Sequence, residues 1–164
     1  MNVAQALFKA LTDAGLDTCF ANPGTSEMHL VYEIGRTPGV RAVLCLQENT
    51  VSGAADGYAR MAGKPAFTLL HVGSGFANSI ANLHNAGRAN TPMVNIVGAN
   101  ATYHQPNFCE HELINGRLAD LARPVSHWTQ EARNASELGI LAAQAAQHAR
   151  MGSGKICTLI APTA

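Results

Sequence analysis

Hydrophobic and polar residues follow two alternating patterns along this chain. Short apolar runs rich in β-branched and bulky residues are typical of buried strands, whereas apolar residues at every third or fourth position are typical of amphipathic helices. The two patterns alternate, with Gly, Pro and Asn at several of the junctions. The expected strands are 18–20, 41–46, 66–70, 93–97, 125–128 and 155–160, and the expected helices are 3–11, 26–34, 50–61, 77–90, 113–121 and 136–150.

This alternation predicts the fold class. Strand–helix–strand units with short turns build an α/β fold, a three-layer open sheet of mostly parallel strands with helices on both faces. We therefore expect one domain over residues 1–164 with about six strands. In such sheets, ligands bind at the carboxyl ends of the strands.

Four polar or glycine-rich segments directly follow expected strands, so all four should lie at one edge of the sheet. They are residues 22–24, 47–49, 71–75 and 98–100. Glu48 is the only acid in these segments, and it follows a run that we expect to be a buried strand. Because a buried carboxylate is costly without a partner, Glu48 is either a salt-bridge or helix-capping residue or part of a ligand site.

Composition and charge exclude several classes of function. The sequence has 47% hydrophobic residues, 13% charged residues and a formal net charge of +0, which gives no electrostatic basis for binding nucleic acid or an anionic membrane. No apolar run is long enough to span a membrane, and the first residues lack the basic segment of a signal peptide. Cys19, Cys45, Cys109 and Cys157 form no C-x-x-C pair, which favours buried, reduced thiols in a cytoplasmic protein.

The glycine-rich segment after the third expected strand has two interpretations. Gly73-Ser74-Gly75 lies between a strand and a helix, as the dinucleotide fingerprint requires. However, that fingerprint belongs after the first strand, and the next acid, Glu110, is too distant to bind a ribose. A tight turn explains these glycines better than a nicotinamide or flavin site.

A metal site is a further alternative. Residues 99–112 are expected to form a long loop, and this loop contains a group of possible zinc ligands: His104, Cys109, Glu110, His111 and Glu112. Their spacing matches no tetrahedral zinc motif, and a polar flap beside an active site explains the same residues. We therefore assign no metal ligands in this chain, and elemental analysis would separate the two interpretations.

Four motifs in order point to a family. FANPGTSE, LQENTVSGAADGYARMAGKPA, LHVGSGFAN and TPMVNIVG lie at successive strand ends, and KICTLIAPTA resembles a closing strand. Together they resemble the N-terminal pyrimidine-binding domain of thiamine diphosphate enzymes of the acetolactate synthase and benzoylformate decarboxylase group. The resemblance covers essentially the whole chain.

The resemblance implies a decarboxylase or carboligase that acts on 2-oxo acids with thiamine diphosphate. Glu48 then matches the glutamate that hydrogen-bonds the cofactor's pyrimidine ring and activates it, and His71 matches an active-site histidine of benzoylformate decarboxylase that transfers protons. Glu48 and His71 are thus the expected catalytic residues. The expected cofactor-binding residues are Asn22, Pro23, Gly24, Thr25, Glu48, His71, Gly75 and Asn78.

Two departures from the family pattern leave the substrate open. The usual Gly-Pro-Gly turn reads Gly73-Ser74-Gly75 here, and the paired histidines of pyruvate decarboxylases are missing. His71 also remains open to a structural interpretation as a hydrogen-bonded residue at the end of a strand.

The resemblance also implies that half of the cofactor site lies elsewhere. The family binds Mg²⁺ and the diphosphate through a Gly-Asp-Gly motif in a separate domain, and this chain has only Ala55-Asp56-Gly57 inside an expected helix. The central and diphosphate-binding domains are therefore expected outside residues 1–164. The chain is either a fragment of a longer enzyme or the small subunit of a two-chain decarboxylase, and a homo-oligomer is expected. A non-catalytic interaction domain is the remaining alternative.

Overall fold

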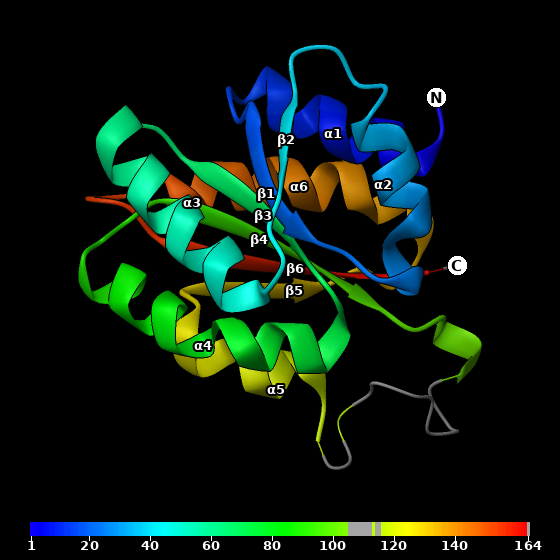
Figure 1. Cartoon of the computed structure of the whole chain (residues 1–164). Helices are drawn as coiled ribbons and strands as arrows, with labels where there is room; N and C mark the ends of the chain where they lie inside the picture. Colours follow the sequence, from blue (N-terminus) through cyan, green and yellow to red (C-terminus); the bar gives the residue numbers. More distant parts are fainter. Residues whose placement is uncertain (105–112, 114–115, 164) are drawn as a thin grey trace.

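A six-stranded sheet forms the centre of the computed structural model, which describes residues 1–104, 113 and 116–163. All of its strand pairs are parallel, in the order β2-β1-β3-β4-β6-β5. The strands are β1 (Thr18–Asn22), β2 (Arg41–Leu44), β3 (Ala66–Leu70), β4 (Met93–Ala99), β5 (Trp128–Glu131) and β6 (Ile156–Pro162). The expected α/β sheet is confirmed, and Figure 1 shows its strands running in one direction.

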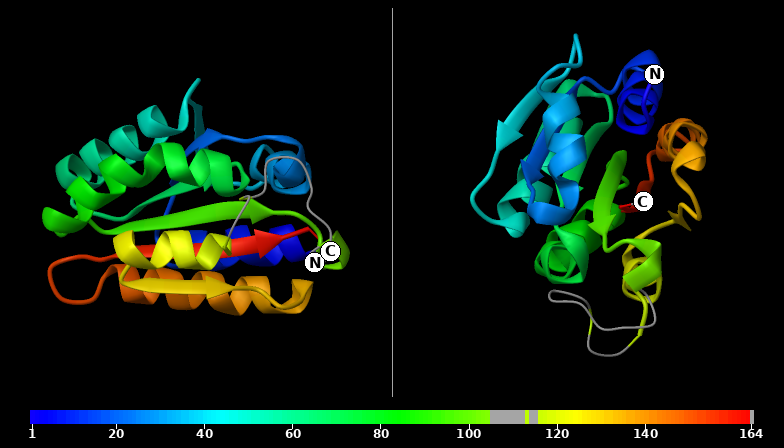
Figure 2. Two further views of the ribbon diagram at one scale, coloured as in Figure 1. Left: turned by 90° about the horizontal axis from the view of Figure 1, so that it is seen from below. Right: turned by 90° about the vertical axis from the view of Figure 1, so that its right-hand side faces the viewer.

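Helices cover both faces of the sheet, as Figures 1 and 2 show. They are α1 (Val3–Asp13), α2 (Met28–Ile34), α3 (Glu48–Ala62), α4 (Val72–Arg88), α5 (Leu118–Ala122) and α6 (Leu138–Ala149). Residues of α1, α2 and α6 pack on one face, and residues of α3, α4 and α5 pack on the other. The three-layer arrangement expected from the sequence is therefore present. Among the described residues, no helix is both long and apolar enough to cross a membrane.

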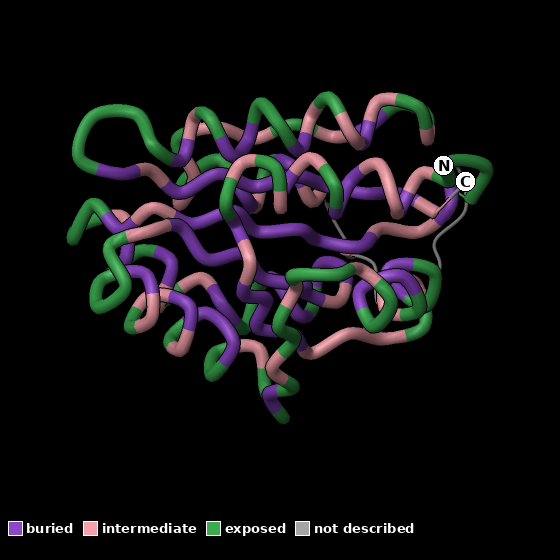
Figure 3. The backbone as a smooth tube through the Cα atoms, turned by 90° about the horizontal axis from the view of Figure 1, so that it is seen from above, coloured by how far each residue is buried: buried purple, intermediate pink, exposed green. Residues whose placement is uncertain are grey.

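The core has two halves, one on each face of the sheet. Alternate residues of β3 serve both: Phe67 and Leu69 belong to the half beneath α1 and α6, and Ala66 and Leu70 to the half beneath α3 and α4. Figure 3 shows the central strands buried and the outer sides of the helices exposed. Fully burying one such large side chain stabilises the fold by about 1.5–3 kcal/mol. Packing on both faces therefore holds the strands in place, and this determines which residues lie where the strands end.

One expected buried strand proves to be an edge strand. The run 41–46 contributes β2, which pairs with β1 alone, and its Leu44 is 70% exposed. Leu46, just beyond the strand, is 89% exposed. Apolar composition does not distinguish a strand inside a sheet from one at its rim, and that is why this expectation was wrong.

Other boundaries also differ from the expected ones. Helix α4 begins at Val72 rather than at 77, so the glycine-rich segment forms its first turn instead of a separate loop. The strand expected at 125–128 lies at Trp128–Glu131, because residues Arg123–Val125 form a 3-10 turn that contains Pro124. Helix α5 is shorter than expected. Cys19, Cys45 and Cys157 are buried free thiols, as expected, whereas Cys109 lies outside the described residues.

Candidate functional site

The chain reverses sharply after β1 and brings an unexpected acid to the sheet edge. Asn22 is the last residue of β1, and Thr25–Glu27 form a 3-10 turn (η1) that precedes α2. The backbone N–H of Gly24 donates a hydrogen bond to Oε2 of Glu27, at 2.7 Å. The Glu27 side chain is completely buried. Glu48 is therefore not the only acid at this edge, which corrects the expectation from the sequence.

Glu27 contacts the histidine that the sequence singled out. The distance from Nδ1 of His71 to Oε2 of Glu27 is 2.8 Å, and the His71 side chain is only 17% exposed. Two glycines leave room for this pair. A Cβ at position 24 would lie 2.4 Å from the His71 ring, and a Cβ at position 98 would lie 1.6 Å from Oε1 of Glu27. No side chain fits at either position without displacing the pair.

The residue after His71 has a strained backbone. His71 is the N-cap of α4, and Val72 has φ = 40°. A β-branched residue is a genuine outlier at positive φ, at a cost of roughly 1–3 kcal/mol. Val72 is 3% exposed, so its side chain is fixed by packing. The backbone is therefore strained where β3 leads into α4, immediately after His71.

Glu48 lies beside the first turns of α4. It is the first residue of α3 and half-buried, and a carboxylate at this position interacts favourably with the positive end of the helix dipole. Nδ2 of Asn78 donates to Oε2 of Glu48 at 3.3 Å. Oε1 lies 3.0 Å from the position that a Cβ of residue 75 would occupy, so glycine at position 75 allows the carboxylate to pack closely against the start of α4. Among the described residues, Glu48 makes no ion pair, which weighs against the salt-bridge interpretation.

The remaining predicted residues lie at the same edge. Asn22, Pro23 and Gly24 are half-buried where β1 ends, whereas Thr25 is exposed. Oγ of Ser26 lies 3.5 Å from Oδ1 of Asn100, which joins the segments after β1 and β4. The contacts of Glu27, Glu48 and Ser26 therefore bring the four expected strand-end segments together at the carboxyl edge of the sheet. The roles of these residues in catalysis and cofactor binding stay predictions.

The metal interpretation is not tested by this geometry. Cys109, Glu110, His111 and Glu112 lie outside the described residues, and His104 ends a 3-10 turn at Thr102–His104. Across residues 1–104, 113 and 116–163, no group of three or more His, Cys, Asp or Glu side chains is arranged to hold a metal ion.

Comparisons with known proteins give a consistent result. Residues 1–138 match the family model described as "Thiamine pyrophosphate enzyme, N-terminal TPP binding domain". The chain is 49% identical over 162 residues to a Mycobacterium tuberculosis protein provisionally named acetolactate synthase large subunit IlvX, covering 99% of this chain and 31% of the relative. It is 32% identical to benzoylformate decarboxylase of Pseudomonas aeruginosa over 149 residues, 91% of this chain and 28% of the relative.

Solved structures agree with the sequence relatives. A thiamine diphosphate-dependent 4-hydroxybenzoylformate decarboxylase of Rhodococcus jostii RHA1 matches with a TM-score of 0.91 and 26% identity, covering 99% of this chain and 30% of that one. A Mycobacterium smegmatis protein provisionally described as a thiamin diphosphate-dependent enzyme matches with a TM-score of 0.90 and 27% identity, and the match covers 99% of this chain and 31% of that one. The chain therefore spans about a third of the length of the relatives it matches.

Proposed function

Because this chain belongs to the family of thiamine pyrophosphate enzymes, as their N-terminal TPP-binding domain, we propose that it is the pyrimidine-binding half of a decarboxylase or carboligase acting on 2-oxo acids. The observation that carries the proposal is Glu48, a half-buried carboxylate at the carboxyl edge of the sheet that lies against Gly75 and accepts a hydrogen bond from Asn78. The relatives named acetolactate synthase and benzoylformate decarboxylase support 2-oxo acids as the substrate class.

The residues at this edge fit an aminopyrimidine ring. A side chain at position 75 would come within 3.0 Å of Oε1 of Glu48, so Gly75 allows the carboxylate to lie against the start of α4. A carboxylate there can hydrogen-bond a ring nitrogen, and the half-buried turn at Asn22, Pro23 and Gly24 lies at the same edge of the sheet. Thiamine diphosphate, when bound, supplies a thiazolium carbon that attacks the carbonyl of a 2-oxo acid once that carbon has lost its proton.

Glu48 has a proton-transfer role in this proposal. It exchanges a proton with the pyrimidine nitrogen, which promotes loss of the proton from the thiazolium carbon. Asn78 contributes by donating a hydrogen bond to Oε2, which helps to fix the orientation of the carboxylate. Glu27, the other acid at this edge, does not take this role, because its side chain is completely buried and paired with His71.

His71 is proposed to transfer protons to and from the reacting substrate carbons. A histidine suits this role because its two nitrogens can donate and accept protons near neutral pH. Its place at the start of α4, one residue from the strained Val72, brings the ring to the same edge as Glu48.

The remaining domain is proposed to cover the exposed apolar rim. Leu44 and Leu46, two positions apart at the end of the edge strand β2, are 70% and 89% exposed, which is unusual for large apolar side chains and supports an interaction surface there. A diphosphate-binding domain of the same or another subunit fits this surface, and it would also supply Mg²⁺ and the contacts to the diphosphate. The assembled enzyme, meaning this chain together with that domain, is therefore the form in which activity is expected.

The test is the substitution Glu48→Gln in the assembled enzyme. Glutamine still donates a hydrogen bond to a ring nitrogen but cannot exchange a proton with it. Hydrogen–deuterium exchange at the thiazolium carbon, followed by NMR in the presence of Mg²⁺, should slow by roughly 10²–10⁴-fold or more. The protein should still fold and still bind thiamine diphosphate.

Asp56→Asn is the matched control, because Asp56 lies on the same helix and pairs with Arg60 away from the site. Exchange in this variant should stay at the wild-type rate. Normal exchange in Glu48→Gln, together with a loss of roughly 1–3 kcal/mol in unfolding free energy, would show that Glu48 is a structural residue instead.

A further inference from the structure

We propose that Glu27 is a positioning residue for His71, in an inference that rests on the function proposed above. In this view Glu27 fixes the orientation of the imidazole and keeps a proton on Nδ1. Nε2 is then the nitrogen that accepts and returns protons during the reaction. Glu27 itself contacts neither substrate nor cofactor, since its side chain is completely buried.

The hydrogen bonds of Glu27 indicate which nitrogen of His71 carries the proton. Oε2 of Glu27 accepts from the backbone N–H of Gly24 at 2.7 Å, and the same oxygen lies 2.8 Å from Nδ1 of His71. An oxygen that accepts the Gly24 amide is an acceptor for its second neighbour as well when the carboxyl group is ionised. His71 is therefore the donor through Nδ1, and in the neutral ring the lone pair belongs to Nε2.

A purely structural role does not account for the buried carboxylate. Capping the three-residue turn η1 uses Oε2 alone, and Oε1 is buried with no hydrogen-bond partner among the described residues. An unsatisfied buried polar atom costs roughly 1–3 kcal/mol, more for a charged group. An apolar residue at position 27 would avoid this cost, so the carboxylate has a role beyond folding.

The surroundings restrict the pair to one geometry. Gly24 lies against Nδ1, Cγ and Cε1 of the ring, and Gly98 lies against Oε1 of Glu27. Val72 holds its strained turn immediately after His71. Because the ring and the carboxylate are both confined, neither can turn away from the other without a movement of the backbone.

This geometry resembles in its chemistry the way an aspartate orients the histidine of a serine protease. There, a buried carboxylate selects the imidazole tautomer and stabilises the imidazolium ion that forms. Here, the substrate's bond to a proton breaks as the N–H bond at Nε2 forms, and the positive charge that develops on the ring is stabilised by Glu27. When Nε2 returns the proton, the ring is neutral again and still protonated on Nδ1.

The first experiment measures the proton directly. Solid-state ¹⁵N NMR of the assembled enzyme with ¹⁵N-labelled histidine reports which ring nitrogens carry protons, and the spectrum of His71→Ala identifies the His71 signals. The proposal predicts a proton on Nδ1, with or without one on Nε2. A neutral ring with a bare Nδ1 would overturn it. This result is independent of activity and of whether Glu27→Gln folds.

The second experiment compares variants kinetically. His71→Ala should lower kcat by about 10²–10⁴-fold. Glu27→Gln should lower kcat by roughly tenfold or more, but not beyond the His71→Ala loss, and KM should change little because Glu27 does not touch the substrate. Glu33→Gln is the matched control, since Glu33 is also buried, at 5% exposure, on the adjacent helix α2. Its kcat should equal that of the wild type.

The double variant separates positioning from general damage. If Glu27 acts only through His71, then Glu27→Gln adds no loss of kcat on top of His71→Ala. A double variant whose loss is the product of the two single losses would overturn the proposal. If Glu27→Gln does not fold, the NMR result on the wild type decides.

Failure of this inference can be told apart from failure of the proposed function. Hydrogen–deuterium exchange at the thiazolium carbon depends on Glu48, so Glu27→Gln should leave it at the wild-type rate. Slow exchange in Glu27→Gln would refute the positioning role while leaving the proposed function intact. Normal exchange in Glu48→Gln would refute the proposed function itself.

Discussion

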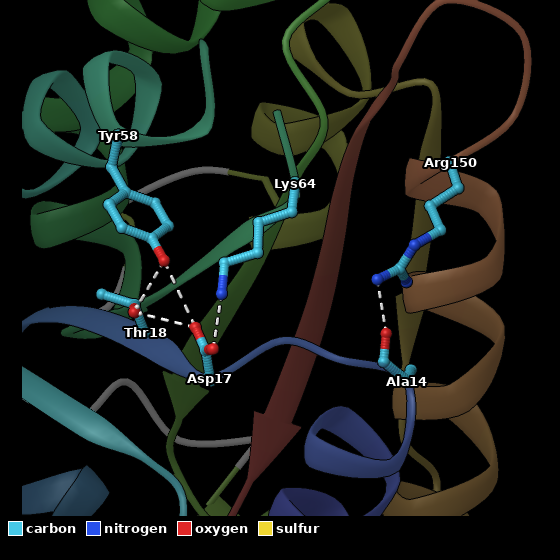
Figure 4. Close-up of polar contacts among 6 residues, drawn as sticks. All are labelled: Ala14, Asp17, Thr18, Tyr58, Lys64 and Arg150. Carbon is cyan, nitrogen blue, oxygen red and sulfur yellow. Dashed lines mark hydrogen bonds and ion pairs between the residues drawn. The ribbon is translucent and has the colours of Figure 1, made fainter. Parts of the chain in front are cut away.

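Polar side chains are paired differently at the two ends of the parallel strands, the amino edge where the strands begin and the carboxyl edge where they end. At the amino edge, the polar groups pair with one another, as Figure 4 shows for Asp17, Thr18, Tyr58 and Lys64. At the carboxyl edge, the pairing is incomplete. Of the three buried side-chain atoms without a hydrogen-bond partner among the described residues, two, in Glu27 and Asn100, belong to this edge.

Polar contacts at the amino edge connect separate elements of the fold. The Asp17 carboxylate forms an ion pair with Lys64 and accepts a hydrogen bond from the Tyr58 hydroxyl at 3.3 Å. The hydrogen bond from Lys64 is the main reason that the pKa of Asp17 lies below its ordinary value. The guanidinium of Arg150 donates to the carbonyl oxygen of Ala14 and so connects the end of α6 to the end of α1.

The carboxyl edge is instead closely packed around three glycines. Gly24, Gly75 and Gly98 each stand where a Cβ would collide with His71, Glu48 or Glu27, respectively. Val72 keeps a positive φ at the same place. Folding alone does not favour unpaired polar atoms and strained turns, and such features concentrate at functional sites. The comparison therefore teaches that the amino edge stabilises the fold and the carboxyl edge is prepared for a ligand.

The largest expected effect comes from adding a side-chain carbon next to Glu27 at the carboxyl edge. Gly98→Ala would place a Cβ 1.6 Å from Oε1 of Glu27, so the carboxylate must move and His71 loses its partner. We expect kcat of the assembled enzyme to fall by about 10²–10⁴-fold, as for loss of a general acid–base group. Steady-state kinetics with a 2-oxo acid measures this.

Gly57→Ala is the control for that substitution. Gly57 lies within α3, and a Cβ there would meet nothing within 4 Å. Alanine should stabilise the helix by roughly 0.5–1 kcal/mol and leave kcat unchanged. Wild-type kcat in Gly98→Ala would show that the space around Glu27 is unimportant, and the contrast between the edges would lose its functional meaning.

An intermediate effect is expected at the exposed rim formed by β2. Leu46→Asp replaces a side chain that is 89% exposed in this chain and that we propose to be covered in the assembled enzyme. Burying a leucine contributes about 1.5–3 kcal/mol, so its loss should raise the dissociation constant of the assembly by about 10–150-fold. Analytical ultracentrifugation measures the constant. An unchanged constant would remove Leu46 from the interface.

The smallest effect is expected at the amino edge. A carboxyl group whose pKa is lower in the folded protein stabilises the fold above its unfolded pKa, and this stabilisation disappears as the pH falls through the folded pKa. Asp17→Asn should therefore reduce the unfolding free energy above about pH 5, by no more than ~1 kcal/mol since the side chain is 45% exposed.

The difference between Asp17→Asn and the wild type should close as the pH falls well below 3.8, the ordinary pKa of the group. Denaturant unfolding at several pH values measures the difference. Exchange at the thiazolium carbon should be unaffected in this variant. Slowed exchange would contradict the division of roles between the two edges.

The sequence predicted the fold and the edge of the sheet at which Glu48 and His71 lie. Alternating periodicities were sufficient for a parallel α/β sheet, and the rule that ligands bind at the carboxyl ends of its strands was sufficient to group Glu48 with His71. The strands take the order β2-β1-β3-β4-β6-β5, and in this order apolar residues are buried on both faces of the sheet. The exposed position of β2 could not be predicted, because its apolar composition is the same as that of a strand inside a sheet.

Glu27 was missed for a different reason. From the sequence it was only an acid in the first turn of a helix, and such acids are common there. Its burial depends on Gly98, which lies 71 positions further along the chain and reaches Glu27 only after β4 has taken its place in the sheet. The available signal was the glycine three positions before Glu27, whose N–H completes a capping box. The positive φ of Val72 had no signal, because valine disfavours it.

The most direct test of the central claim compares the two edges in one measurement. Hydrogen–deuterium exchange mass spectrometry of the assembled enzyme, with and without thiamine diphosphate and Mg²⁺, reports where the cofactor slows amide exchange. We predict protection in peptides that contain residues 22–27, 47–52 and 71–79, and no change in peptides that contain residues 13–18 or 58–65. Protection confined to the amino edge, or equal at both edges, would contradict the assignment of the ligand site to the carboxyl edge.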